Sequence, residues 1–373
     1  MNFNPTLWLR RIEAIPARHF IFGAAATIAA VGVVDHFTGP MTLLSIFYLA
    51  PVAATAWVVG PRAAGSLALM AALTWAFADS IGPFGEPKAA IAYVNDLSML
   101  VIFLFVSTVI GILRDQTQKQ RDLMQDVQRH LLPAMPSVPN LELAARWIPA
   151  WTVGGDYYDV IDAGPHRVAI CLADVSGKGM AAALIMSNVQ ATVRALNAGG
   201  LAPDRLIATL NRLLYRRLRR ESFVTIFFGV LDPVSGELTF CNGGQTPPLV
   251  YRNDGTLERL DSTGPIAGIF AEAAYKSVTI KLDVGDRLVV FSDGVTESEN
   301  AADEEFGEQR LRKALLGGNA RTAEEICDAI VETLTAFRGS RPYNDDVTML
   351  VVARTAAEEQ SEADHGVITY AAV

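Results

Sequence analysis

Long apolar stretches with almost no charged residues fill the first third of the 373-residue chain. Each is close to the roughly 20 apolar residues that a membrane-spanning helix needs. Proline and glycine residues mark the gaps between the stretches. The pattern predicts an all-α transmembrane domain over 1–113, a sensor or anchor with four helices at 18–37, 42–60, 63–82 and 91–113.

The basic residues predict how these helices are oriented. They gather in the N-terminal tail, after the second helix and after the fourth, and the other two connections carry only Lys88. Connections rich in Lys and Arg stay on the cytoplasmic side of a membrane. We therefore expect a multi-pass protein of the inner (cytoplasmic) membrane, in contact with membrane lipid, with its N- and C-termini in the cytoplasm. The residues behind this expectation are Arg10, Arg11, Arg18, Arg62, Arg114, Lys119 and Arg121.

Three aspartates, Asp35, Asp79 and Asp96, lie in or near the predicted spans. A carboxylate inside a bilayer is costly and is by default a functional candidate. Either each aspartate sits at a helix end among the lipid headgroups, or it has a function inside the membrane domain, for which Asp96 is the best candidate. The second interpretation would also suit a small transporter, but no internal repeat supports one.

Residues 113–132 contain no Gly or Pro and predict a helix that continues out of the fourth span, within a linker over 114–139. Prolines from position 133 onward end this helix. Side chains near a 3.5-residue spacing fit a parallel coiled coil in a homodimer. They fit a single amphipathic helix packed on the next domain equally well. These side chains are Leu113, Gln116, Gln120, Leu123, Val127 and Leu131.

From residue 141 the pattern changes to short apolar runs with a period near two, which is typical of strands. Strands are predicted at 141–148, 167–173, 223–231, 237–242, 277–282, 287–292 and 347–354, and helices at 179–198, 203–220, 308–316 and 322–337. Strands in runs with helices grouped between them indicate an α+β domain of antiparallel sheets, over 140–355. The polar tail, 356–373, is expected to be disordered.

The composition excludes several functions for this second part of the chain. The chain has a net charge of −9, and the first 113 residues carry equal numbers of acidic and basic residues, so the excess lies after them. An acidic domain argues against nucleic acid, which needs basic patches. The three cysteines lie far apart and the five histidines are scattered, which argues against a disulfide framework and against zinc ligation.

Four acidic motifs lie at strand ends: VGGDYYDV (153–160), ADVSGKG (173–179), FSDGVTE (291–297) and NDDVT (344–348). Each places an aspartate beside a strand, and three have glycine nearby, where the backbone must approach another group closely. Carboxylates that converge at one end of the sheets need cations to neutralise them. Oxygen ligands without His or Cys select Mg²⁺ or Mn²⁺, and several carboxylates can hold two such ions.

These motifs, in this order, resemble the metal-dependent PPM (type 2C) serine/threonine phosphatases of the bacterial SpoIIE and RsbU branch. The resemblance covers about 126–354 and includes FVTIFFGVLD (223–232) and NGGQTPPLV (242–250). It implies an α-β-β-α sandwich, two antiparallel sheets flanked by helices. The stretch 35–79 is similar to four-helix membrane modules that precede bacterial signalling domains.

The resemblance also implies a site of two Mn²⁺ or Mg²⁺ ions whose activated water attacks phosphoserine or phosphothreonine directly. It implies that Asp174 bridges the two metal ions. In the last motif, Asp345 matches the family pattern better than the adjacent Asp346. The implied catalytic residues are Asp156, Asp174, Asp293 and Asp345, and the implied metal ligands are these four with the Val175 carbonyl and, as an alternative, Asp346.

Four further residues have open roles. Lys178 either helps to hold phosphate or is a solvated lysine of a turn. Asp159 and Glu297 are either outer ligands that hold water or charges at the sheet end. Gln245 stands where the family pattern has His, which affects packing more than metal binding.

The resemblance therefore predicts a membrane-anchored protein phosphatase in bacterial signal transduction. A STAS-type anti-sigma factor antagonist is the expected substrate, which places the chain in sigma factor regulation. One alternative is a catalytically silent binding module with the same fold. Another is a diguanylate cyclase, because GGDYY partly resembles GGDEF, but Tyr157 and Tyr158 do not fit that signature.

Overall fold

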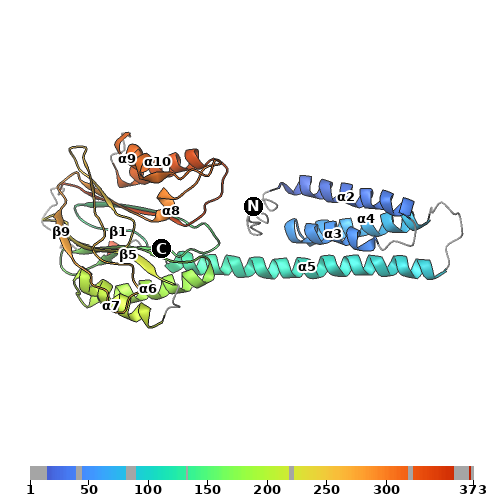
Figure 1. Ribbon diagram of the computed structural model, residues 1–373, viewed down its shortest axis with the longest axis horizontal. Helices are drawn as coiled ribbons and strands as arrows, with labels where there is room; N and C mark the ends of the chain where they lie inside the picture. The colour runs from blue at the N-terminus through green and yellow to red at the C-terminus, as the bar shows by residue number, and fades with distance from the viewer. Residues whose placement is uncertain are drawn as a thin grey trace. The chain divides into compact units, whose positions relative to one another are not determined.

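The computed structural model describes residues 15–38, 44–80, 90–131, 133–217, 222–317, 322–356 and 369–370 (Figure 1). The chain divides into two compact units, Met1–Leu123 and Met124–Val373. The division falls inside the segment predicted as the linker, so the last turns of that helix belong to the second unit.

The first unit is helical. Its helices are α2 (Ala17–Thr38), α3 (Ser45–Val58), α4 (Pro61–Ser80) and the first part of α5 (Ala90–Leu131). The four predicted segments are therefore helical, and the fourth continues through the linker as expected.

Only part of the predicted membrane topology is supported by length and composition. Two stretches in the described part of the chain, Ala17–Thr38 and Tyr93–Gln128, are long and apolar enough to cross a membrane. Helix α3 has only 14 residues. Four spans with cytoplasmic termini remain a prediction.

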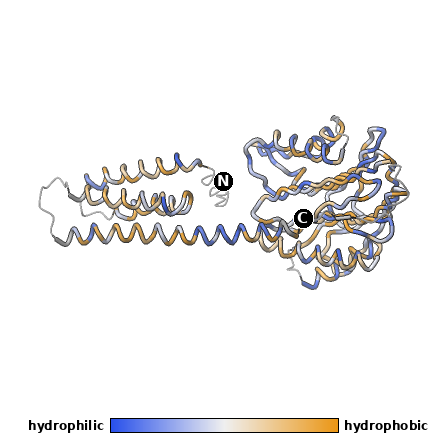
Figure 2. Tube along the Cα trace, turned by 180° about the vertical axis from the view of Figure 1, so that it is seen from behind, coloured by the Kyte–Doolittle hydropathy of each residue, from blue (hydrophilic) through white to orange (hydrophobic). Residues whose placement is uncertain are grey.

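Hydrophobic residues dominate the helices of the first unit (Figure 2). A small core forms around Ile28, Tyr48, Val52 and Phe103, which are almost completely buried. The Tyr48 hydroxyl donates a hydrogen bond to Asp35 Oδ2 at 3.1 Å, so this carboxylate is held against a neighbouring helix. The side chain of Asp79 lies outside the described residues.

The second unit contains two five-stranded antiparallel sheets. One has the order β2-β11-β10-β7-β8 and the other the order β3-β4-β5-β6-β9. The first consists of β2 (Leu141–Ile148), β7 (Leu249–Tyr251), β8 (Leu257–Arg259), β10 (Arg287–Phe291) and β11 (Val347–Arg354). The second consists of β3 (Tyr157–Asp162), β4 (Val168–Val175), β5 (Val224–Leu231), β6 (Glu237–Gly243) and β9 (Val278–Lys281).

Helices cover the outer faces of both sheets, which gives the four layers α-β-β-α (Figure 1). One sheet carries α6 (Met180–Ala198) and α7 (Pro203–Tyr215), and the other carries α9 (Gly307–Gly317) and α10 (Ala323–Arg338). The fold class predicted from the resemblance is therefore confirmed.

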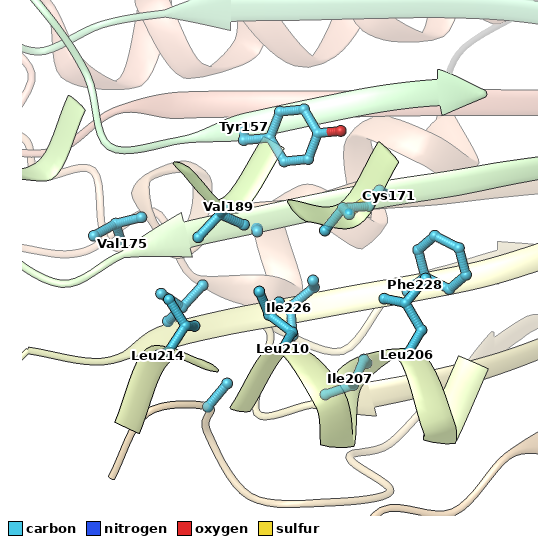
Figure 3. Close-up of a cluster of buried hydrophobic side chains, with 14 of the residues drawn as sticks. Tyr157, Cys171, Val175, Val189, Leu206, Ile207, Leu210, Leu214, Ile226 and Phe228 are labelled. Carbon is cyan, nitrogen blue, oxygen red and sulfur yellow. The ribbon is translucent and has the colours of Figure 1, made fainter. Parts of the chain in front are cut away.

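Each interface between layers has its own apolar core. Ile170 and Phe227 of one sheet meet Leu288 and Leu350 of the other between the sheets. Under α6 and α7, residues such as Leu206 and Phe228 pack together (Figure 3). Because both sheets are covered on both faces, their central strands are continuous apolar runs rather than alternating ones.

The remaining elements differ from the prediction at several points. Strands β3, β7 and β8 and the short helix α8 (Asp293–Thr296) are not among the predicted elements. Helix α7 ends at Tyr215, whereas 203–220 was the expected range, and residues 218–220 lie outside the described part.

The C-terminal tail lies mostly outside the described residues, so its expected disorder stays a prediction. Two of its residues form β12 (Thr369–Tyr370), which pairs with β1 (Pro136–Ser137).

Candidate metal centre

The topology brings the acidic motifs to one end of the sandwich. Asp156 directly precedes β3, whose first residue, Tyr157, pairs with Ala173 of β4, so Asp156 and Asp174 are neighbours across the ladder. In the other sheet, the end of β10 meets the start of β11. That arrangement brings Asp293, at the start of α8, close to Asp345 and Asp346, which precede β11.

Asp346 ties the two sheets together at this end. Its Oδ1 accepts a hydrogen bond from the amide of Ala150 at 2.8 Å, and its Oδ2 accepts one from the amide of Gly155 at 2.7 Å. The Thr348 hydroxyl donates to Asp156 Oδ2 across the same junction. Both oxygens of Asp346 therefore serve to position the loop that carries Asp156.

The glycines of the motifs are there because other groups lie too close for a side chain. A Cβ on Gly154 would lie 2.3 Å from Asp346 Oδ2, and one on Gly294 would lie 2.0 Å from the Asp346 carbonyl oxygen. A Cβ on Gly155 would lie 2.9 Å from the Val175 carbonyl oxygen. The GGD and SDG sequences thus allow the backbones of the motifs to approach one another.

The carboxylates raise one another's pKa. Burial raises the pKa of Asp156 well above its usual value, and the charges of Asp174 and Asp346 raise it further. Burial, followed by the charges of Asp293 and Asp345, raises the pKa of Asp174 to about 7. Burial and Asp345 also raise the pKa of Asp293. A bound cation would relieve this repulsion, so the cluster favours positive charge.

The donor set fits a hard divalent cation, because every acidic side chain here offers oxygen. Within the described ranges, however, no group of three or more His, Cys, Asp or Glu side chains is already arranged around a metal position. Protein donors occupy part of the carboxylate oxygens instead. Asp345 Oδ2, for example, lies 3.0 Å from Lys178 Nζ.

Lys178 contacts the acidic cluster, although its side chain stays exposed to solvent. Besides pairing with Asp345, its ammonium donates to the carbonyl of Asn344. Its positive charge also opposes the rise in the pKa of Asp293. The side chain is still 45% exposed, so a ligand from solution can reach it.

Asp159 matches neither interpretation offered by the sequence. Its side chain is fully buried and accepts hydrogen bonds from Arg194 Nε at 2.7 Å and from the Tyr157 hydroxyl at 2.6 Å. The pair fastens α6 to β3. Glu297, at the end of α8, stays exposed, and partial burial together with the charge of Asp293 raises its pKa.

Gln245 has the packing role expected of it. Its side-chain oxygen accepts from the Thr225 hydroxyl on β5, and its Nε2 donates to the Phe291 carbonyl at the end of β10, at 3.2 Å. The side chain bridges the two sheets behind the acidic cluster.

Gln128, near the end of α5, was not among the predicted site residues, but it supports the site. Its Nε2 donates to the Gly154 carbonyl at 2.6 Å, and its Oε1 accepts from the Gly154 amide at 2.9 Å. The side chain is 3% exposed. A glutamine in a polar helix carries no local signal for such a contact, so only the fold reveals that α5 holds the loop before Asp156.

Comparison with known families identifies the second unit. The family described as Stage II sporulation protein E (SpoIIE) matches residues 164–355, about half of the chain. The chain belongs to the SpoIIE family. Residues 19–126 match a second family, a domain of unknown function (DUF4118).

Two curated relatives agree with the SpoIIE assignment. Protein IcfG of Synechocystis is 29% identical over 272 residues, which are 65% of this chain and 42% of that protein. Phosphoserine phosphatase RsbU of Bacillus subtilis is 29% identical over 246 residues, which are 65% of this chain and 72% of that protein. The chain thus spans less than half of IcfG.

Solved structures confirm the architecture of this SpoIIE-type PPM phosphatase domain. The RsbU and RsbW domains of a Mycobacterium tuberculosis protein superpose with a TM-score of 0.51 at 26% identity, covering 61% of this chain and 63% of that one. The PP2C domain of SiaA from Pseudomonas aeruginosa gives a TM-score of 0.57 at 19% identity, covering 65% and 98%. At this lower identity, the similarity to the SiaA domain shows a shared fold and nothing more.

Proposed function

We propose that this chain is a membrane-anchored protein serine/threonine phosphatase that hydrolyses phosphoserine or phosphothreonine in a two-metal site. The observation that carries the proposal is the convergence of four acidic motifs at one end of a SpoIIE-type sandwich. A relative that covers most of the same region, RsbU, is named a phosphoserine phosphatase.

Asp174 would be the carboxylate that holds both ions, because its charge interacts with acidic residues on both sides of it. Its pKa responds to Asp293 and Asp345, while its own charge raises the pKa of Asp156. Two Mn²⁺ or Mg²⁺ ions would neutralise this cluster and activate the attacking water. Gly155 leaves the Val175 carbonyl free of side-chain crowding, which suits a backbone ligand.

We assign the last ligand position to Asp345 rather than Asp346. Both oxygens of Asp346 accept backbone amides, and these bonds hold the loop of Asp156 in place. Asp345 is partly exposed, and its partner is an exposed cationic side chain, Lys178, which a metal ion could displace. Asp346 then orients the site without holding the ion.

Lys178 has a second role in this proposal. With a metal ion held by Asp345, the Lys178 ammonium would be free to donate to a substrate phosphate oxygen beside the site. Charge-assisted hydrogen bonds to phosphate are among the strong ones. This lysine would supply a phosphate-holding cation on the loop that begins α6.

The substrate we propose is a phosphorylated STAS-type anti-sigma factor antagonist, as in the resemblance to the RsbU branch. A homodimer through α5 also has support. Leu123 and Val127 are 65% and 53% exposed, while Gln128 on another face of the helix is buried. One face therefore packs on the domain, and the other presents an apolar stripe to a second copy.

The first unit would anchor the enzyme through four membrane helices with both termini in the cytoplasm. Its two long apolar helices support membrane association, and its outward-facing aromatic side chains agree with it. The carboxylates Asp35 and Asp96 then lie within or beside the bilayer, as expected for groups with a signalling role.

The test is metal-dependent phosphate release by the full chain in detergent, from a phosphoserine protein, with Mn²⁺ or Mg²⁺. Replacing the bridging carboxylate in Asp174→Asn should lower kcat/KM by about a thousandfold, since such a metal site contributes several kcal/mol to the transition state. The matched control, Asp261→Asn, removes an exposed carboxylate and should leave turnover unchanged. A folded protein without turnover under any divalent metal would instead support a silent binding module.

A further inference from the structure

A hollow lies on the first unit, where α5 passes the end of α3. It has a volume of about 230 Å³, several times the roughly 30 Å³ that a water molecule takes up in the liquid. Two arginines and a tryptophan are prominent in its lining. The lining residues are Trp57, Val58, Arg114, Thr117, Gln118 and Arg121.

Close backbone contacts fix the walls of this hollow. A Cβ on Gly60, whose φ is +131°, would lie 2.8 Å from Arg114 Nη1, and Gly111 of α5 approaches Pro61 so closely that its Cβ position is 2.7 Å from the proline Cβ. Arg114 Nη2 donates to the Val58 carbonyl at 3.0 Å. The turn between α3 and α4 is therefore seated on α5, and the hollow opens on the next turns of that helix.

The hollow is positively charged, and no carboxylate of the described residues forms an ion pair with either of its arginines. Arg114 binds a backbone carbonyl rather than a carboxylate. Arg121, two helical turns further on, is exposed and forms no ion pair with another described residue. The neighbouring Asp122 accepts a hydrogen bond from Gln118 at 2.9 Å, so its charge is partly satisfied on that side. Two guanidinium groups thus share one small space.

We propose that this hollow binds the phosphate group of a net-negative ligand, presented by the headgroup of an anionic lipid. The inference rests on the membrane placement proposed above. The Gly60–Pro61 turn separates two apolar helices, so it marks the level at which they leave the bilayer on the basic side. Tryptophan favours this interfacial depth, and the cytoplasmic leaflet is rich in anionic lipid. Guanidinium groups match phosphate oxygens in geometry as well as charge.

The experiment is a calorimetric titration of the full chain in neutral detergent with dioctanoyl phosphatidylglycerol. Dioctanoyl phosphatidylcholine tests the need for net negative charge, and inorganic phosphate tests a soluble source. We expect saturable binding of phosphatidylglycerol, with Arg121→Gln weakening it about tenfold through loss of a charge-assisted bond. The matched control Lys119→Gln removes an exposed charge from the same helix outside the hollow, and we expect it to weaken binding by less than about threefold.

Three results would overturn the inference. Equal losses in the two variants would indicate diffuse attraction to a basic helix, and equal affinity for the two lipids would exclude recognition of net charge. No saturable binding of any of the three ligands would exclude the site. Saturable binding of inorganic phosphate that Arg121→Gln weakens would support the site and assign it to a soluble phosphate. Phosphatase activity is not a readout here, so a failure leaves the proposed reaction untouched.

Discussion

The two units of this chain place the same kind of side chain in opposite environments. In the SpoIIE-type unit, Phe227 and Phe228 are fully buried. In the helical unit, Phe22 and Phe37 are each 79% exposed. Large apolar side chains that face outward around a bundle are a liability in water but are favourable in hydrocarbon. The burial of a side chain must therefore be judged against the solvent that surrounds its own unit.

The second unit also buries acidic side chains, which usually stay in water. The second unit buries Asp156, Asp159 and Asp346. Each has hydrogen-bond donors that offset the cost of leaving water. Asp159 is fully paired inside the protein, whereas the repulsion around Asp156 remains for a cation to relieve. Asp159 is thus structural, and we propose Asp156 as a metal ligand.

The largest expected effect on stability comes from removing the cation that pairs with the buried carboxylate of Asp159. Arg194→Met leaves a fully buried carboxylate without its cation, so we expect the second unit to lose about 3 kcal/mol of unfolding free energy. Thermal and denaturant unfolding of the full chain measure this change.

Two further variants check that reasoning. Arg205→Met removes an arginine whose side chain is 80% exposed and should be close to neutral. The double variant Arg194→Met with Asp159→Asn should recover part of the loss, because the remaining side chain is neutral. A single variant as stable as the wild type would show that the pair does not hold α6 to β3.

An effect of similar size should separate the environments of the two units. Phe105 on α5 is 66% exposed. Phe105→Asp should disfavour membrane insertion by about 3 kcal/mol if this surface faces hydrocarbon. The measurement is the fraction of the chain in the membrane pellet after expression.

The matched control is Leu316→Asp in α9, where a leucine of the second unit is 49% exposed. That surface faces water, so the pellet fraction should not change. If Phe105→Asp were equally harmless, the helical unit would not be embedded in a bilayer, and the contrast between the units would need another cause.

The smallest effect concerns the lysine at the acidic cluster. Lys178→Met should raise the inhibition constant of inorganic phosphate about tenfold, through loss of one charge-assisted hydrogen bond. The affinity for Mn²⁺ should stay the same or increase, because the metal no longer competes with the ammonium for Asp345.

Phosphate inhibition and calorimetric Mn²⁺ binding give these two readouts separately. Lys281→Met, which changes an exposed lysine on β9, should alter neither. An unchanged phosphate inhibition constant in Lys178→Met, with weaker metal binding, would mean that the lysine only shapes the loop.

Much of the sandwich could be predicted from the sequence, because most of its strands are apolar runs or alternate with a period near two. The predicted ranges 141–148 and 347–354 coincide with β2 and β11. Strands β7 and β8 have three residues each, too few for a period to emerge. Strand β3 carries Asp159 and Asp162, and its acidic residues obscure the apolar pattern.

The order of the acidic motifs and their position at strand ends could be read from the sequence, because spacing and local pattern are properties of the chain alone. The packing of the layers shows which of the two neighbours positions the loop, since Asp346 accepts hydrogen bonds from Ala150, beside the adjacent strand, and from Gly155, beside the opposite sheet. The pairing of Asp159 with Arg194 and the hydrogen bonds between Gln128 and Gly154 likewise appear only in the folded structure. The physical reason is that hydrogen bonds between residues far apart along the chain depend on how the layers pack, and no local pattern encodes them.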